Sequence, residues 1–287
     1  MTETGRTVAD GLVAPLRAAG CVFAEDEARL LVEAAGDAGD AADPDALEAM
    51  VGRRVAGEPL ELVLGWVEFD GLRLQVAPGV FVPRQGTVAM VDEAVALLAG
   101  IERPRVVDLC CGVGAVGCAV VRRVPDADVA LSDVDATAVR LARANLDAHG
   151  GAGADERERV AVAGDLFSGL PEGWRGQVDV CTANAPYVPS RAVAFMPRES
   201  RDHEPLATVD GGEDGLAVHR RLAAVAGEWL RPGGHLLVEV SPDQVDGALT
   251  LLAERGLAVR AVASTDDGPV VVVATTPFDP APPRLGP

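Results

Sequence analysis

Short apolar runs alternate with amphipathic segments from Val106 onward, and this alternation constrains the fold more than any other feature of the sequence. Strands that alternate with helices form a mostly parallel sheet with helices on both faces. The pattern predicts strands over 106–109, 128–132, 160–163, 178–183 and 234–240, and helices over 87–99, 114–123, 136–148, 214–230 and 243–254. Two later β runs, 257–263 and 269–275, flank a Thr-Asp-Asp-Gly turn and predict an antiparallel pair at the end of the sheet. The predicted fold class is α/β, with a Rossmann-like, seven-stranded domain over residues 85–276.

The residues before this domain follow other patterns. Residues 1–60 carry leucines at spacings typical of short amphipathic helices, and Asp43-Pro44 predicts a helix start with an N-cap aspartate. Residues 61–84 change to an alternating pattern around Asp70-Gly71, which predicts a β-hairpin linker. We therefore expect a small helical domain, a linker and the main domain, followed by a disordered, proline-rich tail over 277–287.

Charge and cysteine usage disfavour several classes of function. The formal net charge is −19 and all 25 basic residues are arginine, which disfavours broad contact with nucleic-acid backbones. The five cysteines form no CxxC pair and no cluster with histidine, so we predict no metal site and a reducing compartment. No apolar run approaches the length of a membrane span and no signal segment is recognisable. The expectation is a cytoplasmic protein without membrane association.

The stretch RVVDLCCGVGAVGCAVV combines a strand, a glycine turn and a helix. Gly112, Gly114 and Gly117 satisfy the GxGxxG pattern of dinucleotide-binding folds, although a glycine-rich turn can also serve packing alone. Asp108 decides between two candidate cofactors. A carboxylate there would repel the pyrophosphate of a nicotinamide dinucleotide. The same carboxylate suits S-adenosyl-L-methionine, which carries an ammonium and a sulfonium and no phosphate. We therefore predict S-adenosyl-L-methionine as the cofactor.

Further polar positions follow the next two predicted strands. Asp133 ends the second strand and is placed to bind the two ribose hydroxyls of either cofactor. Asp165 and Leu166 follow the third strand and are predicted to hydrogen-bond and pack against adenine; the alternative for Asp165 is an N-cap or turn residue. Ligands bind at the carboxyl edge of open α/β sheets, where these side chains should meet.

The fourth predicted strand stops at Asn184-Ala185-Pro186-Tyr187, which contains the only tyrosine of the chain. An amide nitrogen is a poor nucleophile because its lone pair is delocalised. The Asn184 side-chain oxygen and the Ala185 carbonyl would accept hydrogen bonds from a substrate NH2 group and hold its nitrogen in line with the S–CH3 bond. Pro186 would stiffen the turn and Tyr187 would offer a flat face for a planar group. The alternative interpretation is a simple strand-ending turn.

These motifs resemble those of the HemK/PrmC family of release-factor glutamine methyltransferases, which methylate the glutamine amide of a Gly-Gly-Gln loop. The resemblance covers residues 50–275: GEPLELVLGWVEFDGLRLQV is similar to the family's inter-domain segment, FVPRQGTVAM to its Pro-Arg-x-x-Thr segment, and DHEPLATVDGGEDGL to a later segment. It implies that Arg84 and Thr87 belong to the site, that Asp108 to Gly114 form the cofactor loop, and that the helical domain recognises a protein substrate, a peptide chain release factor. It places Asn184–Tyr187 on the family's Asn-Pro-Pro-Tyr motif.

The sequence departs from this family at a few positions. Ala185 replaces the first proline of the motif, Cys110 and Cys111 replace a glycine and a threonine in the loop, and Val88 replaces an acid. These departures indicate a divergent branch, whose substrate need not be a release factor. The predicted catalytic residues are Asn184, Ala185, Pro186 and Tyr187, and the predicted cofactor-binding residues are Arg84, Thr87, Asp108, Cys110, Cys111, Gly112, Val113, Gly114, Asp133, Asp165, Leu166 and Asn184.

Other functions stay open at this point. Adenine methyltransferases use a similar Asn/Asp-Pro-Pro-Tyr, so methylation of a nucleic-acid base is an alternative that the charge disfavours. A catalytically idle cofactor-binding module is a second alternative, and an NAD-dependent oxidoreductase is a third that Asp108 disfavours. Glu239, at the end of a predicted strand, is either a substrate contact or a solvent-facing edge residue. The Arg-Asp-His-Glu run around His203 is interpreted as a polar loop near the cleft.

Overall fold

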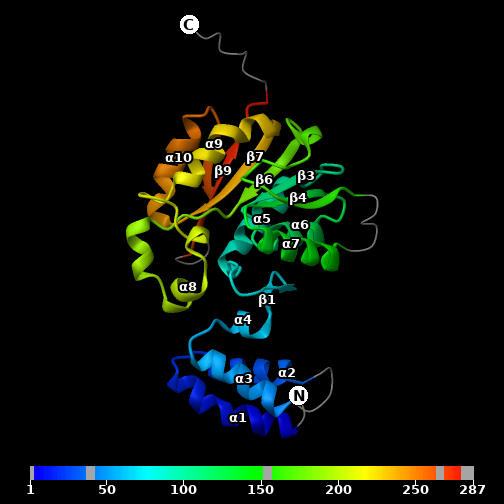
Figure 1. Cartoon of the computed structure of the whole chain (residues 1–287). Helices are drawn as coiled ribbons and strands as arrows, with labels where there is room; N and C mark the ends of the chain where they lie inside the picture. Colours follow the sequence, from blue (N-terminus) through cyan, green and yellow to red (C-terminus); the bar gives the residue numbers. More distant parts are fainter. Residues whose placement is uncertain (1–2, 37–42, 151–156, 263–267, 279–287) are drawn as a thin grey trace.

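The computed structural model describes residues 3–36, 43–150, 157–262 and 268–278. Its N-terminal part packs α1 (Glu3–Ala18), α2 (Ala24–Ala34) and α3 (Pro44–Val55) around an apolar core of their own, at the bottom of Figure 1. The Asp43 side chain accepts a hydrogen bond from the Asp45 backbone N–H at 3.0 Å, which confirms the predicted start of α3. The predicted disorder of the tail concerns residues that lie, from 279 on, outside the described ones.

A short linker joins these helices to the main domain. It consists of α4 (Leu60–Leu64) and a hairpin of β1 (Trp66–Phe69) and β2 (Leu72–Gln75). Asp70 and Gly71 have φ values of 49° and 70°, as a two-residue hairpin turn with both central residues left-handed requires, so the predicted hairpin is confirmed. Phe69 and Leu74 belong to the apolar core of the main domain. The domain boundaries at residues 60, 84 and 276 stay predictions.

The main domain contains the predicted seven-stranded sheet. Its strands are β3 (Arg105–Leu109), β4 (Asp128–Asp133), β5 (Arg159–Ala163), β6 (Val178–Ala183), β7 (Leu230–Val240), β8 (Ala258–Val262) and β9 (Val270–Thr275). Their order across the sheet is β5-β4-β3-β6-β7-β9-β8, and β9 pairs antiparallel with both of its neighbours while the other pairs are parallel. This is the Rossmann-like α/β fold that the alternation of strands and helices predicts.

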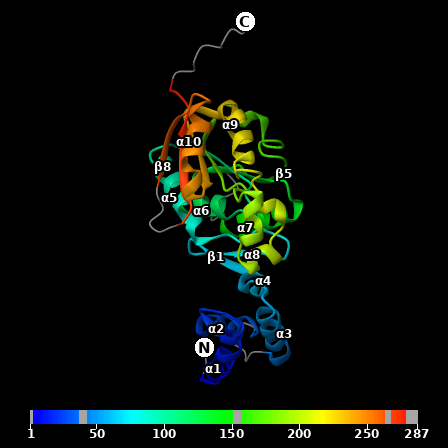
Figure 2. The ribbon, with the colours of Figure 1, turned by 90° about the vertical axis from the view of Figure 1, so that its left-hand side faces the viewer.

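Helices cover both faces of the sheet, and successive strand residues supply the two cores (Figures 1 and 2). On one face lie α5 (Val88–Leu97), α6 (Ala115–Arg123) and α7 (Ala136–His149), and on the other α9 (Ala217–Trp229) and α10 (Val245–Ala253). Val106 and Val180 pack in the first core, whereas their neighbours Val107 and Cys181 pack in the second. Burial on both faces explains why these strands are continuous apolar runs.

The structure differs from the predicted elements in several places, and residues 61–64, expected to begin the alternating β pattern, belong to the helix α4. β7 begins at Leu230 rather than at 234, because Leu230 pairs with Val178 before a register shift between Val178 and Val180. Between β6 and α9, the chain forms two short 3-10 turns, Ser190–Phe195 and Leu206–Thr208, around the helix α8 (Arg198–His203). These elements were not predicted, because segments of three to six residues are too short to show an apolar period. The run around His203, interpreted as a polar loop, is instead the end of α8.

The helix α8 reaches toward α3 and α4 at the junction of the two parts (Figure 2). Arg54 on α3 pairs with Glu199 on α8 at 2.6 Å, so the chain after β6 contacts the N-terminal helices directly. Within the described ranges, no helix combines the length and the apolar character that a bilayer crossing needs.

Candidate active site

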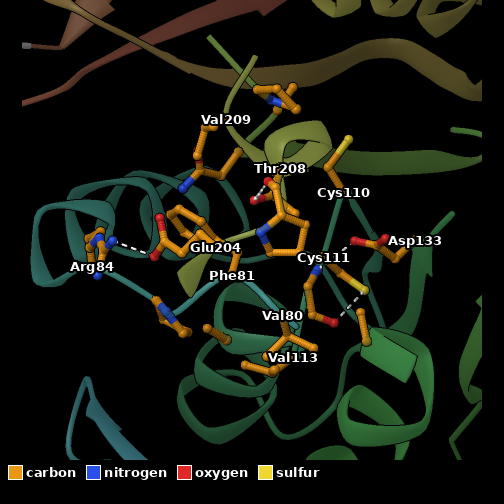
Figure 3. A pocket seen from close by; sticks show the side chains of 18 of the residues that line it. Val80, Phe81, Arg84, Cys110, Cys111, Val113, Asp133, Glu204, Thr208 and Val209 are labelled. Atoms are coloured by element: carbon orange, nitrogen blue, oxygen red, sulfur yellow. Dashed lines mark hydrogen bonds and ion pairs between the residues drawn. The ribbon is translucent and has the colours of Figure 1, made fainter. Parts of the chain in front are cut away.

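A cavity of about 290 Å³ opens at the carboxyl edge of the sheet, where β3, β4 and β6 end. The linker supplies one wall and the segment 196–209 supplies another. Figure 3 shows Arg84 and Glu204 on one side of the cavity and Asp133, Cys110 and Cys111 on the other. The predicted site residues that line it are Arg84, Thr87, Asp108, Cys110, Cys111, Gly112, Val113, Asp133, Asn184, Ala185, Pro186 and Tyr187.

The glycine loop turns sharply between β3 and α6. Cys110, Gly112 and Gly114 all have positive φ, at 52°, 53° and 81°, a conformation that glycine adopts without strain. The Gly112 N–H donates to an Asp133 carboxylate oxygen at 2.8 Å, which ties the loop to the end of β4. Burial raises the pKa of the Cys110 thiol to about 12, with a smaller contribution from Asp133, so this thiol stays protonated and behaves as a small apolar group.

Asp108 anchors the glycine loop from inside the fold. Its carboxyl is 2% exposed and accepts hydrogen bonds from the Gly117 N–H at 3.0 Å and from the Thr182 hydroxyl at 2.9 Å. Burial raises the pKa of Asp108 to about 7, although these two hydrogen bonds favour the ionised form. Both oxygens are engaged by the chain itself, so the predicted contact with the cofactor stays a prediction beside this anchoring role.

Asp133 stands at the cavity with hydrogen-bonding capacity to spare. One of its oxygens accepts from Gly112, and the other accepts from the Asp135 N–H at 2.9 Å. Each carboxylate oxygen has a second lone pair, so Asp133 can also accept from the hydroxyls of a ribose. Burial is the main cause that raises the pKa of Asp133.

Gly114, Asp165 and Leu166 are not among the residues of the described chain that line the cavity. Asp165 is exposed and pairs with Arg221 at 2.6 Å. Leu166 has a φ of 54°, and its carbonyl accepts a hydrogen bond from the Ser132 hydroxyl at 2.7 Å. The predicted role of Asp165 and Leu166 at the adenine stays a prediction.

Asn184 follows β6 directly and lines the cavity beside Thr87. Its Nδ2 donates to the Thr87 hydroxyl at 3.2 Å, so the amide NH2 is turned into the protein and the side-chain oxygen is the acceptor left for a substrate. Thr87 is 3% exposed and starts the turn into α5. Two segments 97 residues apart thus set the orientation of this amide.

The backbone after Asn184 is held by Gln244, which the sequence did not single out, and by the DHEPLATVDGGEDGL segment that carries part of the family resemblance. Gln244 Nε2 donates to the Tyr187 carbonyl at 2.8 Å, and the Gly211 N–H donates to the Val188 carbonyl at 2.8 Å. A Cβ on Gly211 would lie 2.7 Å from the Pro186 carbonyl oxygen. The glycine-rich stretch DGGEDGL therefore packs against the backbone of the predicted catalytic turn.

An acidic side chain also closes the outer wall of the cavity. Arg84 forms an ion pair with Glu204, donates to the Ser200 hydroxyl at 3.1 Å, and lies 5.2 Å from the centre of the Phe81 ring. The Glu204 side chain is 1% exposed, and burial raises its pKa. The sequence placed Glu204 only in a polar run near the cleft, because nothing local distinguishes it from the surface acids of the same run.

The charges around the cavity suit the predicted cofactor. Among the lining residues that the structure describes, the carboxyl groups are Asp108, Asp133, Asp135 and Glu204, and the only arginine is Arg84. Such a lining favours a ligand with an ammonium and a sulfonium over a phosphate-bearing one. No group of three or more His, Cys, Asp or Glu side chains in the described ranges could hold a metal ion.

Comparisons with known proteins agree on the kind of domain. A family model described as "Methyltransferase small domain" matches residues 71–196. The "Release factor glutamine methyltransferase" of Gloeobacter violaceus is 38% identical over 226 residues, which cover 78% of this chain and 77% of the relative. The "4-amino-L-phenylalanine/4-methylamino-L-phenylalanine methyltransferase" of Streptomyces pristinaespiralis is 36% identical over 211 residues, covering 72% of this chain and 69% of the relative.

Among solved structures, the hMettl16 catalytic domain, in complex with a 3'UTR hairpin, matches with a TM-score of 0.56 and 13% identity. The match covers 82% of this chain and 83% of that chain, and at this identity it shows a shared fold.

Proposed function

This chain belongs to the family of release factor glutamine methyltransferases, and on that premise we propose that it methylates the glutamine side chain in the Gly-Gly-Gln loop of a peptide chain release factor. As a member of this family it is an S-adenosyl-L-methionine-dependent N-methyltransferase. The observation that most directly supports an amide substrate is the orientation of Asn184, whose NH2 group donates to Thr87 and whose oxygen is left to accept from a substrate. The predicted cytoplasmic location belongs to the same proposal.

The cofactor, when bound, supplies a methyl group on a positively charged sulfur. Asp133, Gly112 and Val113 would hold it at the carboxyl edge of the sheet. The Asn184 side-chain oxygen and the Ala185 carbonyl would accept the two hydrogens of the glutamine NH2 group and orient its nitrogen. Ala185 acts there through its backbone, so the absence of the family's proline leaves this acceptor in place. The nitrogen loses its proton after transfer, so no strong base is needed before it.

A labelling experiment tests the substrate. The protein is incubated with methyl-labelled cofactor and a purified release factor, and mass spectrometry locates the label. The expected product carries one methyl group on the glutamine side chain of the Gly-Gly-Gln loop. A release factor in which that glutamine is replaced by alanine is the matched control and should stay unlabelled. Firm cofactor binding without label on the intact release factor would contradict the proposed substrate.

The first prediction concerns Asn184→Ala. Loss of the side-chain acceptor leaves the substrate nitrogen free to rotate, so kcat should fall by about 100-fold or more, the scale on which loss of one oriented hydrogen bond acts. Cofactor binding should stay within about threefold, because the main contacts proposed for the cofactor come from the glycine loop and Asp133. Single-turnover transfer and isothermal titration with the cofactor measure the two effects. Equal transfer rates in the variant and the parent would contradict the proposed role.

A small aromatic amine is a second candidate substrate. The relative from Streptomyces pristinaespiralis is named for methylation of 4-amino-L-phenylalanine, and an aromatic NH2 group also has a delocalised lone pair. The same acceptors would orient it, and the Tyr187 ring could stack on it. Adding 4-amino-L-phenylalanine to the labelling reaction in place of the release factor separates the candidates. Label on the amino acid alone would favour the second one.

A further inference from the structure

Glu239 is a buried acid that the chemistry described above does not use. It lies near the end of β7, which pairs with the β6 strand that leads into Asn184. Glu239 is 1% exposed, and within the described residues its Oε2 atom has no hydrogen-bond partner. An ionisable group at this depth is costly to bury, so its position beside the predicted catalytic turn calls for an explanation.

Several side chains of the site converge on this carboxyl group. The strand register that pairs Ala183 with Val238 brings Asn184 beside Glu239. Thr87, Tyr187 and Asn184 each favour the ionised form of its carboxyl group, against the burial that raises its pKa. The Asn184 Nδ2 atom donates one N–H to the Thr87 hydroxyl at 3.2 Å, which leaves its second N–H for the Glu239 carboxyl group beside it. From the other face of the sheet, His219 Nε2 lies 3.0 Å from the Glu239 backbone carbonyl oxygen. His219 therefore contacts the backbone of Glu239 on one face of the sheet, while the Glu239 side chain lies on the other face, toward the site.

We propose that Glu239 is a positioning residue that determines which end of the Asn184 amide faces the substrate. A carboxylate only accepts hydrogen bonds, so the Asn184 NH2 group turns toward Glu239 and Thr87, and its oxygen turns toward the cavity. The reversed amide would present NH2 to the NH2 of the substrate, and two donors cannot bond. Tyr187 also lines the cavity and the charge of Glu239 acts on its hydroxyl, so the same carboxylate would accept from this hydroxyl and steady the ring at the cavity wall.

This inference rests on the proposed function, because it assumes a substrate that donates from an NH2 group. Glu239 does not line the cavity among the residues described, so it acts through Asn184 and Tyr187 rather than on the substrate. It also makes a prediction about pH. A protonated Glu239 carries an O–H donor and no longer requires the Asn184 NH2 group to face it, so orientation is lost when this group is protonated.

The titratable and charged groups near Glu239 determine whether the transfer rate rises or falls with pH. Burial is the largest cause that raises the pKa of Glu239, and it also raises the pKa of Tyr187. Burial lowers the pKa of His219 on α9, so this ring stays neutral at neutral pH. The positive charge of Arg84, from the linker, acts in the opposite direction and lowers the pKa of Tyr187. Protonation of Glu239 as the pH falls through its raised pKa should therefore lower the transfer rate.

The second prediction tests this role with Glu239→Gln, which keeps the shape and adds a donor. Single-turnover transfer to the release factor should slow by about 10- to 100-fold, the scale of a misplaced reacting group. The KM for the release factor and the Kd for the cofactor should each change by less than about threefold, and the fall in rate at low pH should disappear. Glu239→Asp keeps an acceptor, so it should restore part of the rate and retain the fall at low pH.

Glu158→Gln is the matched control. Glu158 also accepts a hydrogen bond, from Trp174 Nε1 at 2.9 Å, but it precedes β5 at the opposite edge of the sheet. Its rate and pH profile should equal those of the parent. A Glu239→Gln variant with the parent's rate, or one that loses cofactor binding in proportion to rate, would overturn the positioning role. If that variant does not fold, as thermal unfolding would show, Glu239→Asp decides: loss of the low-pH fall in a folded variant overturns the proposal.

The parent protein in the same assay separates the two proposals. A release factor that the parent leaves unlabelled contradicts the proposed function, and with it the positioning that assumes the substrate. A release factor that the parent and Glu239→Gln label at the same rate contradicts the positioning alone.

Discussion

At the end of β3, the Asp108 carboxyl accepts hydrogen bonds from Gly117, in the first turn of α6, and from Thr182, on the neighbouring strand β6. It is 2% exposed, and burial raises its pKa from 3.8 to about 7. A group whose pKa is higher in the folded chain than in the unfolded one stabilises the fold below its unfolded pKa, and that stabilisation is lost as the pH rises through the folded value. At pH 8 the Asp108 carboxyl is ionised although it is buried, so it makes the folded state less stable than it is at low pH.

The third prediction follows for Asp108→Asn. The carboxamide oxygen still accepts from Gly117, but the pH-dependent cost disappears. Between pH 4 and pH 8, the free energy of unfolding of the parent should fall relative to that of the variant, by up to about 4 kcal/mol if the full shift is expressed. Urea unfolding of both proteins at several pH values measures this difference, and the other buried acids cancel in the comparison. A difference that stays constant over this range would contradict the raised pKa.

The segment that precedes α9 shows how one element supports another. Residues 209–212 run beside the chain that follows Asn184: the Val188 N–H donates to the Val209 carbonyl at 2.9 Å, and the Gly211 N–H returns to Val188. Gly211 is buried, and a Cβ there would lie 2.5 Å from the Gly215 carbonyl oxygen and 2.7 Å from that of Pro186. Both obstacles are backbone atoms, which cannot rotate away.

The fourth prediction concerns Gly211→Ala. The added methyl group must displace the predicted catalytic turn, so the variant should lose about 1–3 kcal/mol of stability, as overpacked sites do. Its kcat should fall more than its cofactor affinity, because the glycine loop is not touched. Urea unfolding and single-turnover transfer measure both effects. Gly227→Ala in α9 is the control: a Cβ there meets no atom within 4 Å, and the variant should gain up to about 1 kcal/mol. Similar behaviour of the two variants would contradict this account.

The two parts of the chain meet around Arg54. Its guanidinium pairs with the buried Glu27 of the N-terminal helices at 2.6 Å and with Glu199 of α8 at 2.6 Å. Glu27 is 8% exposed, whereas the Glu199 side chain is 51% exposed. Arg54 thus forms a buried ion pair with Glu27 inside the helical part and a solvent-facing ion pair with Glu199 across the junction. The two pairs should differ in strength, since water screens only the second one.

The fifth prediction compares Arg54→Met with Glu199→Gln. The first leaves Glu27 buried without a partner and should cost about 3–5 kcal/mol of unfolding free energy. The second removes the exposed pair and should cost less than about 1 kcal/mol. Urea unfolding of both variants checks the order, and equal losses would contradict the assigned burial. Because Glu199 lies on α8, near the Glu204 that lines the cavity, transfer by Glu199→Gln also reports whether the junction influences the site.

Local patterns were enough to predict most of the strands and helices and several of the residues that line the cavity. The strand at 178–183 was predicted with its observed bounds, and Asp70-Gly71 and Asp43-Pro44 marked a real hairpin and a real helix start. A continuous apolar run, a two-residue turn and an N-cap are each properties of a few neighbouring residues, so they can be read without knowing the topology. The same patterns did not predict α8, which has only six residues, or single out Gln244. They placed Glu204 in a polar loop near the cleft without a role of its own.

What neighbouring residues cannot encode is which distant side chains meet. The Asn184-Ala185-Pro186-Tyr187 motif was recognisable in the sequence, but the orientation of its amide depends on Thr87, 97 residues earlier, and on Glu239. Those partners come together because β6 lies beside both β3 and β7 in the sheet, and because α5 packs under the same edge. The chemical groups were therefore set by the order of the amino acids. Their donor and acceptor directions were decided only by folding, since a hydrogen bond depends on the distance and angle between atoms that the topology brings together.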